Sequence, residues 1–374
     1  MTVNETISHK TILDYLIGLL AIRNPNNSYK DEYCQALSEV VKIIQNASFI
    51  TAGKNNKIKI GVTDTIKRMS DVSSLISLVI DQYLKGKITD ANWMFRTHWE
   101  KIHIPKYDDE ECNRVFFRMR NRKEEEDIDF GPSDLLHISI NKRDNVSNQR
   151  FSINGFPCLY ASTSLYQCWE ELRRPHLQNL YASGILFTDN LRLLDLRLIR
   201  SIDNEKQLFA FMTRLPLIIA CSIKTRNDKA AFKAEYIIPQ ILLHTIINIK
   251  YNIDGIIYSS MRKDYDYYNA DFCFEDFSKN ENIVIPAKVT SANKDYVDNL
   301  LKMIEISRPL NFEQELIRGT ISLHASTLYE ETLFGQMEQQ IVSTKIFKAF
   351  NTQMLSIHNI SQRIEELTNS IIIL

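Results

Sequence analysis

Glycine is scarce in this chain of 374 residues, which contains only ten glycines. Neither of the glycine-rich patterns that cradle phosphates, GxGxxG and GxxxxGK[ST], occurs in the sequence. An excess of charge of one sign is also lacking, because 45 lysine and arginine residues are balanced by 46 aspartate and glutamate residues, for a net charge of −1. The chain therefore lacks the electrostatic footprint of a protein that binds nucleic acid or an anionic membrane surface.

Closely spaced cysteines and long apolar runs are missing as well. No apolar run approaches the ~18 residues that a membrane span needs, and the first residues lack the basic-then-apolar layout of a signal peptide. We therefore expect a cytoplasmic protein with reduced thiols, buried as structural cysteines. The six cysteines form no CxxC zinc knuckle, and the sequence predicts no metal site; they are Cys34, Cys112, Cys158, Cys168, Cys221 and Cys273.

The composition is that of a globular protein, with 44% hydrophobic and 24% charged residues. At roughly 100–200 residues per domain, the length suggests two or three domains. The first hundred residues repeat apolar side chains at steps of three and four, which predicts a helical N-terminal domain over residues 1–108. The predicted helices cover residues 9–23, 29–47, 71–84 and 89–102.

From about residue 111 the pattern changes to short apolar and aromatic segments with helices between them, which predicts an α+β domain over residues 109–290. Helical periodicity returns after Pro286, beginning with "KDYVDNLLKMIEI", and predicts a C-terminal helical segment over residues 291–374. The predicted strands are "RVFFRMR", "LLHISI", "GILFT", "LRLLDL", "IDGIIYSS", "FCFE" and "NIVIPA".

The densest set of polar residues lies in "NQRFSINGFPCLYASTSLYQCWEELRRPH", residues 148–176. Asn154-Gly155 predicts a hairpin turn. Ser162 or Thr163 then caps a predicted helix that runs to about residue 174. At about 100° per residue, Glu171 lies at the edge of the apolar face of this helix, and Glu170 points further toward solvent as a surface charge.

Two interpretations of this stretch remain open from the residues alone. An arginine, a tyrosine and a glutamate near one another often make a structural ion pair beside a core aromatic. The same three groups can also line a cleft, where a fixed cation, a phenol and a carboxylate serve binding and catalysis.

The spacing resembles the signature of RES domains, which are found in bacterial toxins of toxin–antitoxin systems. Tyr160 follows Arg150 by ten residues and Glu171 follows Tyr160 by eleven, and "LYAS" and "ELR" are similar to the family's segments at these places. The family's serine element is matched by "DGIIYSSMR", with Ser260 in the serine role and Ser259 as the alternative. Asn269 resembles an asparagine before the family's last strands, and the resemblance covers about residues 111–285.

This resemblance implies a mixed β core like that of ADP-ribosyltransferases and NAD as the substrate. It implies cleavage of the nicotinamide–ribose bond, whose transition state resembles an oxocarbenium ion. The Glu171 carboxylate would stabilise the developing positive charge. Arg150 suits the pyrophosphate, Tyr160 offers a flat face and a hydroxyl, and Ser260 would position the ribose or the nucleophile.

Two further residues of the α+β domain are weaker candidates. Arg118 in "FFRMR" resembles an arginine with which related transferases hold NAD, although exposed arginines on a half-buried strand, Arg118 and Arg120, are the plainer interpretation. His137 in "LLHISI" is expected to be a core or hydrogen-bonded histidine.

Three other functions remain open. ADP-ribosyl transfer to a macromolecule would use the same Arg150, Tyr160 and Glu171. A ribonuclease of the HEPN type would use Arg96 and His103, which six residues separate. A non-catalytic module would bind partners through its helical flanks.

The implied partners are NAD, a cognate antitoxin and a second copy of the chain bound through the helical regions. The apolar "SIIIL" at residues 370–374 suggests a tail that docks on the protein and covers the cleft. If the tail inhibits, removal of residues 311–374 should raise NAD turnover.

Overall fold

The computed structural model divides into two compact units that each combine distant parts of the chain. The first unit comprises Met1–Tyr107, Ser147–Ile153 and Leu194–Asp266, and the second comprises Asp108–Val146, Asn154–Leu193 and Tyr267–Leu374. Residues 147–153 and 194–266, which lie inside the predicted α+β domain, thus fold with the N-terminal helices. The structure describes residues 4–21, 24, 26–99, 108–110, 114–123, 129–188, 190–199, 201–248, 252–260, 280–288, 300–301, 303–322 and 329–343.

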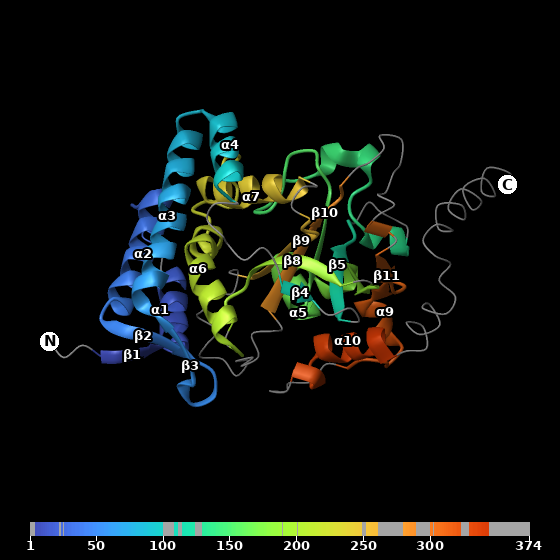
Figure 1. The fold of residues 1–374 in the computed structure, drawn as a ribbon. Coiled ribbons are helices and arrows are strands. Elements are labelled where there is room, and N and C mark those ends of the chain that lie inside the picture. The colour runs from blue at the N-terminus through green and yellow to red at the C-terminus, as the bar shows by residue number, and fades with distance from the viewer. Residues whose placement is uncertain are drawn as a thin grey trace. The chain divides into compact units, whose positions relative to one another are not determined.

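The four predicted N-terminal helices are confirmed in the first unit (Figure 1). α2 starts with a capping box, in which the Ser28 side chain accepts from the backbone of Asp31 and the Asp31 side chain accepts from that of Ser28. α3 begins at Val62, well before the predicted start at Asp71. The helices are α1 (His9–Ala21), α2 (Tyr29–Ile44), α3 (Val62–Leu84) and α4 (Ile88–Trp99).

A small sheet in the first unit was not predicted. β2 (Ala47–Ala52) lies between β1 (Asn4–Ser8), which runs parallel to it, and β3 (Ile58–Gly61), which runs antiparallel. Gly53 follows β2 with φ of +74°, a conformation that favours glycine. Such short strands contain few alternations of apolar and polar residues. The strong helical periodicity of the segments around them therefore determined the prediction.

The first unit also contains two apolar helices and a strand from the middle of the chain. α6 (Glu205–Ser222) packs on α3, and α7 (Ile237–Ile247) packs on α3 and α4. β9 (Gly255–Ser259) neighbours β8 (Leu191–Leu196), which confirms two of the predicted strands. The short 3-10 turn Ala234–Tyr236 leads into α7.

The second unit is built on an antiparallel sheet in the order β11-β7-β5-β6-β10. β12 (Leu310–Asn311) also pairs with β7, and β4 (Asp108–Glu110) pairs with the first residues of β8. This sheet and its helices confirm the predicted α+β class. The strands are β5 (Val115–Asn121), β6 (Cys158–Ser162), β7 (Leu180–Phe187), β10 (Glu281–Pro286) and β11 (Ile304–Ile306).

Three helices pack into the core of this unit: α5 (Leu165–Glu171), α9 (Phe312–Ile317) and α10 (Leu333–Ser343). One hydrophobic cluster joins them to the sheet, and it includes Phe117 and Met119 of β5, Leu165 and Cys168 of α5, Phe312 of α9, Ile321, and Leu333, Met337 and Ile341 of α10.

Described residues of the C-terminal segment, as far as Ile341, are therefore part of this core. Deletion of residues 311–374 would remove core side chains, so it cannot report only on inhibition by a tail. The apolar "SIIIL" on which that hypothesis rests lies outside the described residues.

Three local predictions were wrong. "LLHISI" is not a strand, because it lies between the 3-10 turns Pro132–Leu135 and Ile140–Asn145, and the Asp134 carboxylate accepts from the Gly131 backbone N–H at 2.9 Å. Turn chemistry at Gly131 and Pro132 outweighed the alternating pattern. "IEI" forms β11 rather than a helix, because it pairs with β7. α5 is capped by Ser164, not by Ser162 or Thr163.

The hairpin turn at Asn154 and Gly155 is present, with Gly155 at φ of +70°. No helix among the described residues is long and apolar enough to cross a membrane. The predicted strand "FCFE" lies outside the described part of the chain.

Candidate functional site

Glu171 is the last residue of α5 and is held by two neutral amides. Its Oε1 accepts a hydrogen bond from Asn282 Nδ2 at 2.8 Å and another from Gln167 Nε2 at 3.2 Å. Gln167 lies one helical turn before Glu171, so this second bond is an i, i+4 contact along α5. The carboxylate itself is half-buried. These bonds fix the orientation of the acid without cancelling its charge.

Ser162 fixes Asn282 in turn. Asn282 on β10 lies directly opposite Ser162 on β6, and Ser162 Oγ donates to Asn282 Oδ1 at 2.5 Å. Ser162, Asn282 and Gln167 are all buried. Because Asn282 Oδ1 accepts from the serine, its Nδ2 must be the donor that faces Glu171. The result is a buried chain of hydrogen bonds, Ser162–Asn282–Glu171.

Tyr160 lies on the same face of the sheet as this chain. Alternate residues of a strand share a face, so Tyr160 and Ser162 point the same way on β6. Opposite them on β10 are Val284 and Asn282, respectively. The side chain of Tyr160 is half-buried. The second unit therefore brings Tyr160 to the sheet face on which Asn282 holds Glu171.

Arg118 and Arg120 differ in their surroundings, although both lie on β5. Arg118 Nη1 donates to the Tyr160 carbonyl oxygen at 2.7 Å, and its Nε is buried with no hydrogen-bond partner among the described residues. Burial lowers the pKa of Arg118 to about 10, which still leaves it cationic at neutral pH. Arg120 donates to the Asp134 carbonyl oxygen and lies over the Phe130 ring. Arg118 is thus not an exposed surface arginine.

Glu170 is not the surface charge that the sequence analysis predicted. It is only 6% exposed, and Arg174 Nε lies 3.0 Å from both of its carboxylate oxygens. The helix ends at Glu171, and Arg173 and Arg174 then adopt φ of +68° and +53°. This tight reversal brings the Arg174 guanidinium back onto Glu170 and beside the ring of Trp169. Glu170 is a structural ion-pair partner.

His137 is the hydrogen-bonded core histidine that the sequence analysis favoured. It is buried, and its Nδ1 lies 2.9 Å from the Ile138 carbonyl oxygen. Burial lowers the pKa of His137, the bond to the carbonyl opposes this shift, and the charge of Arg118 adds to it. A neutral imidazole is therefore the form expected at neutral pH.

Arg150 belongs to the first unit, where it meets the end of α6. Its Nη1 donates to the Cys221 carbonyl oxygen at 2.8 Å, and its guanidinium lies over the Tyr236 ring at 5.4 Å. Cationic side chains stabilise the unpaired carbonyls at a helix C-terminus. This contact leaves further N–H donors of Arg150, since a guanidinium has five.

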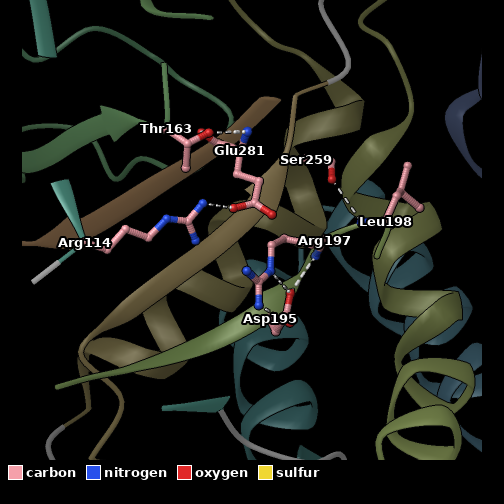
Figure 2. A network of polar contacts seen from close by, with 7 residues as sticks. All are labelled: Arg114, Thr163, Asp195, Arg197, Leu198, Ser259 and Glu281. Carbon is pink, nitrogen blue, oxygen red and sulfur yellow. Dashed lines mark hydrogen bonds and ion pairs between the residues drawn. The ribbon is translucent and has the colours of Figure 1, made fainter. Parts of the chain in front are cut away.

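The two candidate serines also lie in the first unit, at the end of β9. Ser259 Oγ accepts from the Leu198 backbone N–H at 2.9 Å, which gives this hydroxyl a structural partner (Figure 2). Ser260 follows the strand, and both serines are half-buried. The assignment of the serine role to Ser260 stays a prediction.

Two ion pairs that the sequence analysis did not predict are drawn in Figure 2. In the second unit, Arg114 Nη2 lies 2.7 Å from Glu281 Oε2, and the Glu281 backbone N–H donates to Thr163 Oγ1. In the first unit, Arg197 pairs with Asp195, with Nε to Oδ1 at 2.9 Å and Nη2 to Oδ2 at 2.8 Å. Each pair lies within one unit, and we interpret both as structural ion pairs.

The predicted site residues are therefore divided between the units. The second unit holds Tyr160, Glu171 and Arg118, and the first holds Arg150 and Ser260. That these residues act on one ligand stays a prediction. Asn269 and His103 lie outside the described residues.

Local sequence patterns did not reveal the hydrogen-bond network of Ser162, Gln167 and Asn282 around Glu171. Ser162 was considered as a helix cap and as part of "LYAS", and Gln167 as part of a helix. Asn282 left one faint signal: it is a polar residue within a run that otherwise forms a buried strand. Its contact with Glu171 spans 111 residues of sequence, which no local pattern can reveal.

The buried cysteines do not supply a nucleophile. Burial raises the pKa of each of the thiols of Cys158, Cys168 and Cys221 to about 12, so they stay protonated at neutral pH. Cys34 is exposed, unlike the buried cysteines that the sequence analysis expected. Within the described residues no group of three metal-ligating side chains is found.

The family of this segment follows from a comparison with known domains. Residues 133–278 match the family model of the RES domain. The matched range includes Arg150, Tyr160, Glu171 and both candidate serines, and it confirms the resemblance seen in the sequence. This part of the chain is therefore similar to RES domains.

A relative with a curated name extends the match. A protein of Bacillus subtilis (strain 168) that is named "Putative toxin YopC" is 32% identical over 235 residues, which make up 57% of this chain and 50% of that protein. The chain thus spans half the length of this relative. No solved structure shows a significant match to the chain.

Proposed function

We propose that this protein is a RES-type toxin that cleaves the bond between nicotinamide and ribose in NAD. The RES-domain match and the name of the Bacillus subtilis relative support the toxin class. The observation that carries the reaction is the buried hydrogen-bond chain from Ser162 through Asn282 to Glu171. A carboxylate held in one orientation by neutral donors is what glycosidic cleavage requires.

The chemistry assigns Glu171 to the ribose. As the nicotinamide bond breaks, its electron pair leaves with nicotinamide, and the ribose carbon becomes positively charged. The Glu171 carboxylate stabilises that charge or holds a ribose hydroxyl beside it. Nicotinamide departs as a neutral base from a cationic ring, so no general acid is needed. The amides of Asn282 and Gln167 carry no charge of their own, so these two hydrogen bonds orient Glu171 without an opposing charge.

The remaining predicted residues bind the dinucleotide. In this proposal the planar guanidinium of Arg150 binds phosphate oxygens in pairs, using donors other than the one that Cys221 accepts. Tyr160 packs its ring on nicotinamide or ribose. Arg118, a buried cation tied to the Tyr160 backbone, adds positive charge near that ring, and Ser260 orients the ribose or the nucleophile.

The acceptor defines the type of enzyme. Attack by water at the ribose carbon gives ADP-ribose and a proton, and attack by phosphate gives ADP-ribose phosphate. Attack by a protein side chain makes the protein an ADP-ribosyltransferase, which would use the same residues. A cognate antitoxin and a second copy of the chain are the proposed protein partners.

One incubation separates these outcomes. The purified protein is mixed with NAD labelled in the ADP-ribose part, in buffers with and without phosphate, and all products are identified by chromatography and mass spectrometry. Free nicotinamide with ADP-ribose supports hydrolysis, and a product that requires phosphate supports phosphorolysis. Label on protein supports transfer. Unchanged NAD under all conditions, together with cleavage of an added RNA, would replace the proposal by the ribonuclease.

A further inference from the structure

α5 is short for a helix that carries a catalytic carboxylate. It has seven residues, from Leu165 to Glu171, and helices of this length are not stable in isolation. At 1.5 Å per residue its two ends lie only about 9 Å apart. Gln167, which donates to Glu171, lies in the first turn. Fraying of that first turn would therefore move both Glu171 and one of its two described donors.

The first turn of α5 is held by residues from far along the chain. Ser164, the N-cap, accepts from Gln167 N through its hydroxyl and from Cys168 N through its carbonyl. Glu338 Oε1 of α10 accepts from Leu165 N at 2.6 Å, and Tyr329 Oη accepts from Tyr166 N at 3.4 Å. The first four backbone N–H groups of α5 thus all have acceptors.

Glu338 and Tyr329 also bind each other. The Tyr329 hydroxyl donates to Glu338 Oε1, the same oxygen that accepts from Leu165 N. Both residues are nearly buried, at 8% exposure for Glu338 and 6% for Tyr329. Burial of a carboxylate is costly unless hydrogen bonds compensate, and the N-terminus of a helix favours negative charge. The hydrogen bonds from Leu165 and Tyr329, and the position at the N-terminus of α5, thus compensate for the burial of the Glu338 carboxylate.

Apolar packing joins the same two segments. Leu165 and Cys168 of α5 share a hydrophobic cluster with Leu333 and Met337 of α10. The ring of Phe334 also meets Tyr166 and Trp169, at centroid distances of 5.6 and 5.3 Å. α5 is therefore fixed by α10 along its side as well as at its first turn. Residues 329–343 lie beyond the segment that matches the RES domain.

We propose that Glu338 and Tyr329 are positioning residues for Glu171: by holding the first turn of α5, they set the place of the carboxylate at its last residue. This inference rests on the proposed function, because it assigns Glu171 to the reaction. In this proposal the C-terminal segment is required for activity, because two of its residues position the catalytic helix. Neither residue touches the substrate in this proposal.

The test compares Glu338→Ala and Glu338→Gln in the full chain. Alanine removes the acceptor for Leu165 N, whereas glutamine keeps an acceptor oxygen and should restore most of the function. For Glu338→Ala we expect kcat for NAD cleavage to fall about tenfold, since small misplacements of reacting groups are costly. KM should change less than about twofold, because Arg150 and Tyr160 lie outside α5.

A stability-matched control separates positioning from general weakening of the fold. Ile185→Ala removes a buried side chain of β7 that lies outside the cluster around α5, and it leaves the cap intact. Well below its melting temperature this variant should retain nearly normal kcat. Glu331→Gln changes an exposed glutamate near the same helix and should leave both kcat and stability unchanged. Equal kcat losses for Glu338→Ala and Ile185→Ala would overturn the proposal.

Hydrogen exchange tests the cap without reference to NAD. The backbone amides of Leu165 and Tyr166 should exchange about tenfold faster in Glu338→Ala than in the wild type, and Tyr329→Phe should accelerate exchange less. If the wild type cleaves no NAD, the proposed function fails while this measurement still tests the cap. Unaltered exchange of both amides would refute the cap whatever the activity. If Glu338→Ala does not fold, Glu338→Gln and Tyr329→Phe provide the same comparisons.

Discussion

Two carboxylates, one in each unit, are held by opposite kinds of partner. Asp195 in the first unit is buried and receives two bonds from the Arg197 guanidinium and one from the Arg197 backbone N–H. Glu171 in the second unit receives its described bonds from the neutral amides of Asn282 and Gln167. Both acids are fixed in orientation, but the described partner of Asp195 carries the opposite charge, whereas the two described partners of Glu171 are neutral.

In the proposed function, the kind of partner distinguishes a structural carboxylate from a catalytic one. A bidentate guanidinium fixes the orientation of a carboxylate and offsets its negative charge. Such a carboxylate stabilises a positive charge on a substrate only weakly. Amide donors give geometry and leave the charge available for a developing cation. The neighbouring residues Glu170 and Glu171 repeat the contrast within one helix, because Glu170 is paired with Arg174. Burial alone does not distinguish them.

The largest effect is expected at Glu171. Glu171→Gln keeps the size and the hydrogen-bonding capacity of the side chain but removes its charge, so kcat should fall about a thousandfold while the melting temperature stays near that of the wild type. Steady-state assays of nicotinamide release check this. Glu313→Gln, which changes an exposed glutamate of α9, is the matched control and should leave kcat unchanged.

Glu170→Ala is not a suitable control, although the helical phase predicted Glu170 to be a surface charge. It would leave the Arg174 guanidinium without its buried partner and destabilise the protein. A Glu171→Gln variant with wild-type kcat would remove the contrast between the two kinds of carboxylate.

The next effect is on stability and concerns Asp195. Asp195→Asn removes the charge that faces Arg197, and loss of one partner of a buried pair should cost about 3 kcal/mol of unfolding free energy. Denaturant titration measures this, with exposed Asp203→Asn as the control. A cost below about 0.5 kcal/mol, typical of surface pairs, would mean that the Asp195–Arg197 pair is not structural.

The same pair predicts an acid dependence. Burial alone would raise the pKa of Asp195, but the hydrogen bonds and charge of Arg197, with the charge of Arg214, lower it. A depressed pKa contributes stability that is present above the unfolded value of about 3.9 and is lost as pH falls through the folded value. The unfolding free energy should therefore fall below about pH 4, and less steeply in Asp195→Asn. Parallel pH profiles would contradict this assignment.

A smaller effect is expected at Asn282. Asn282→Ala removes one of the two described donors to Glu171 and leaves the Ser162 hydroxyl without its partner. We expect kcat to fall about tenfold, which corresponds to about 1.4 kcal/mol of transition-state stabilisation. Unfolding free energy should fall by about 1–3 kcal/mol as well. A loss of stability with no loss of kcat would show that Asn282 does not position the carboxylate.

Ser162→Ala should give the smallest effect, a two- to threefold fall in kcat, because it acts on Glu171 only through Asn282; that corresponds to roughly 0.5 kcal/mol. A double-mutant cycle provides the check. If Ser162 acts through Asn282, its substitution should have no further effect on kcat in the Asn282→Ala background. Additive losses would mean that the two side chains act separately.

The sequence predicted the parts of the fold that local periodicity encodes. The four N-terminal helices and the strands β5, β7 and β10 of the second unit were found because their apolar side chains repeat at 3.6 or 2 residues. The three-stranded sheet of the first unit was missed because its strands are short. The division of the middle of the chain between two units depends on long-range packing, which periodicity does not record.

The candidate site was predicted only in part, for the same reason. The spacing of Arg150, Tyr160 and Glu171 identified the RES domain, but helical phase misplaced Glu170, since two residues with positive φ turn Arg174 back onto it. The contacts of Asn282 and Glu338 with α5 bridge 111 and 173 residues of sequence. Such partners become visible only when the sheet and the C-terminal helix are in place.

Nicotinamide release from NAD by the wild type, Glu171→Gln and Glu313→Gln, measured side by side under identical conditions, shows whether the Glu171 carboxylate takes part in cleavage. If it does, the wild type and Glu313→Gln release nicotinamide, and the folded Glu171→Gln protein releases almost none. Intact NAD with the wild type, or equal rates of nicotinamide release by all three proteins, would show that Glu171 does not serve this reaction.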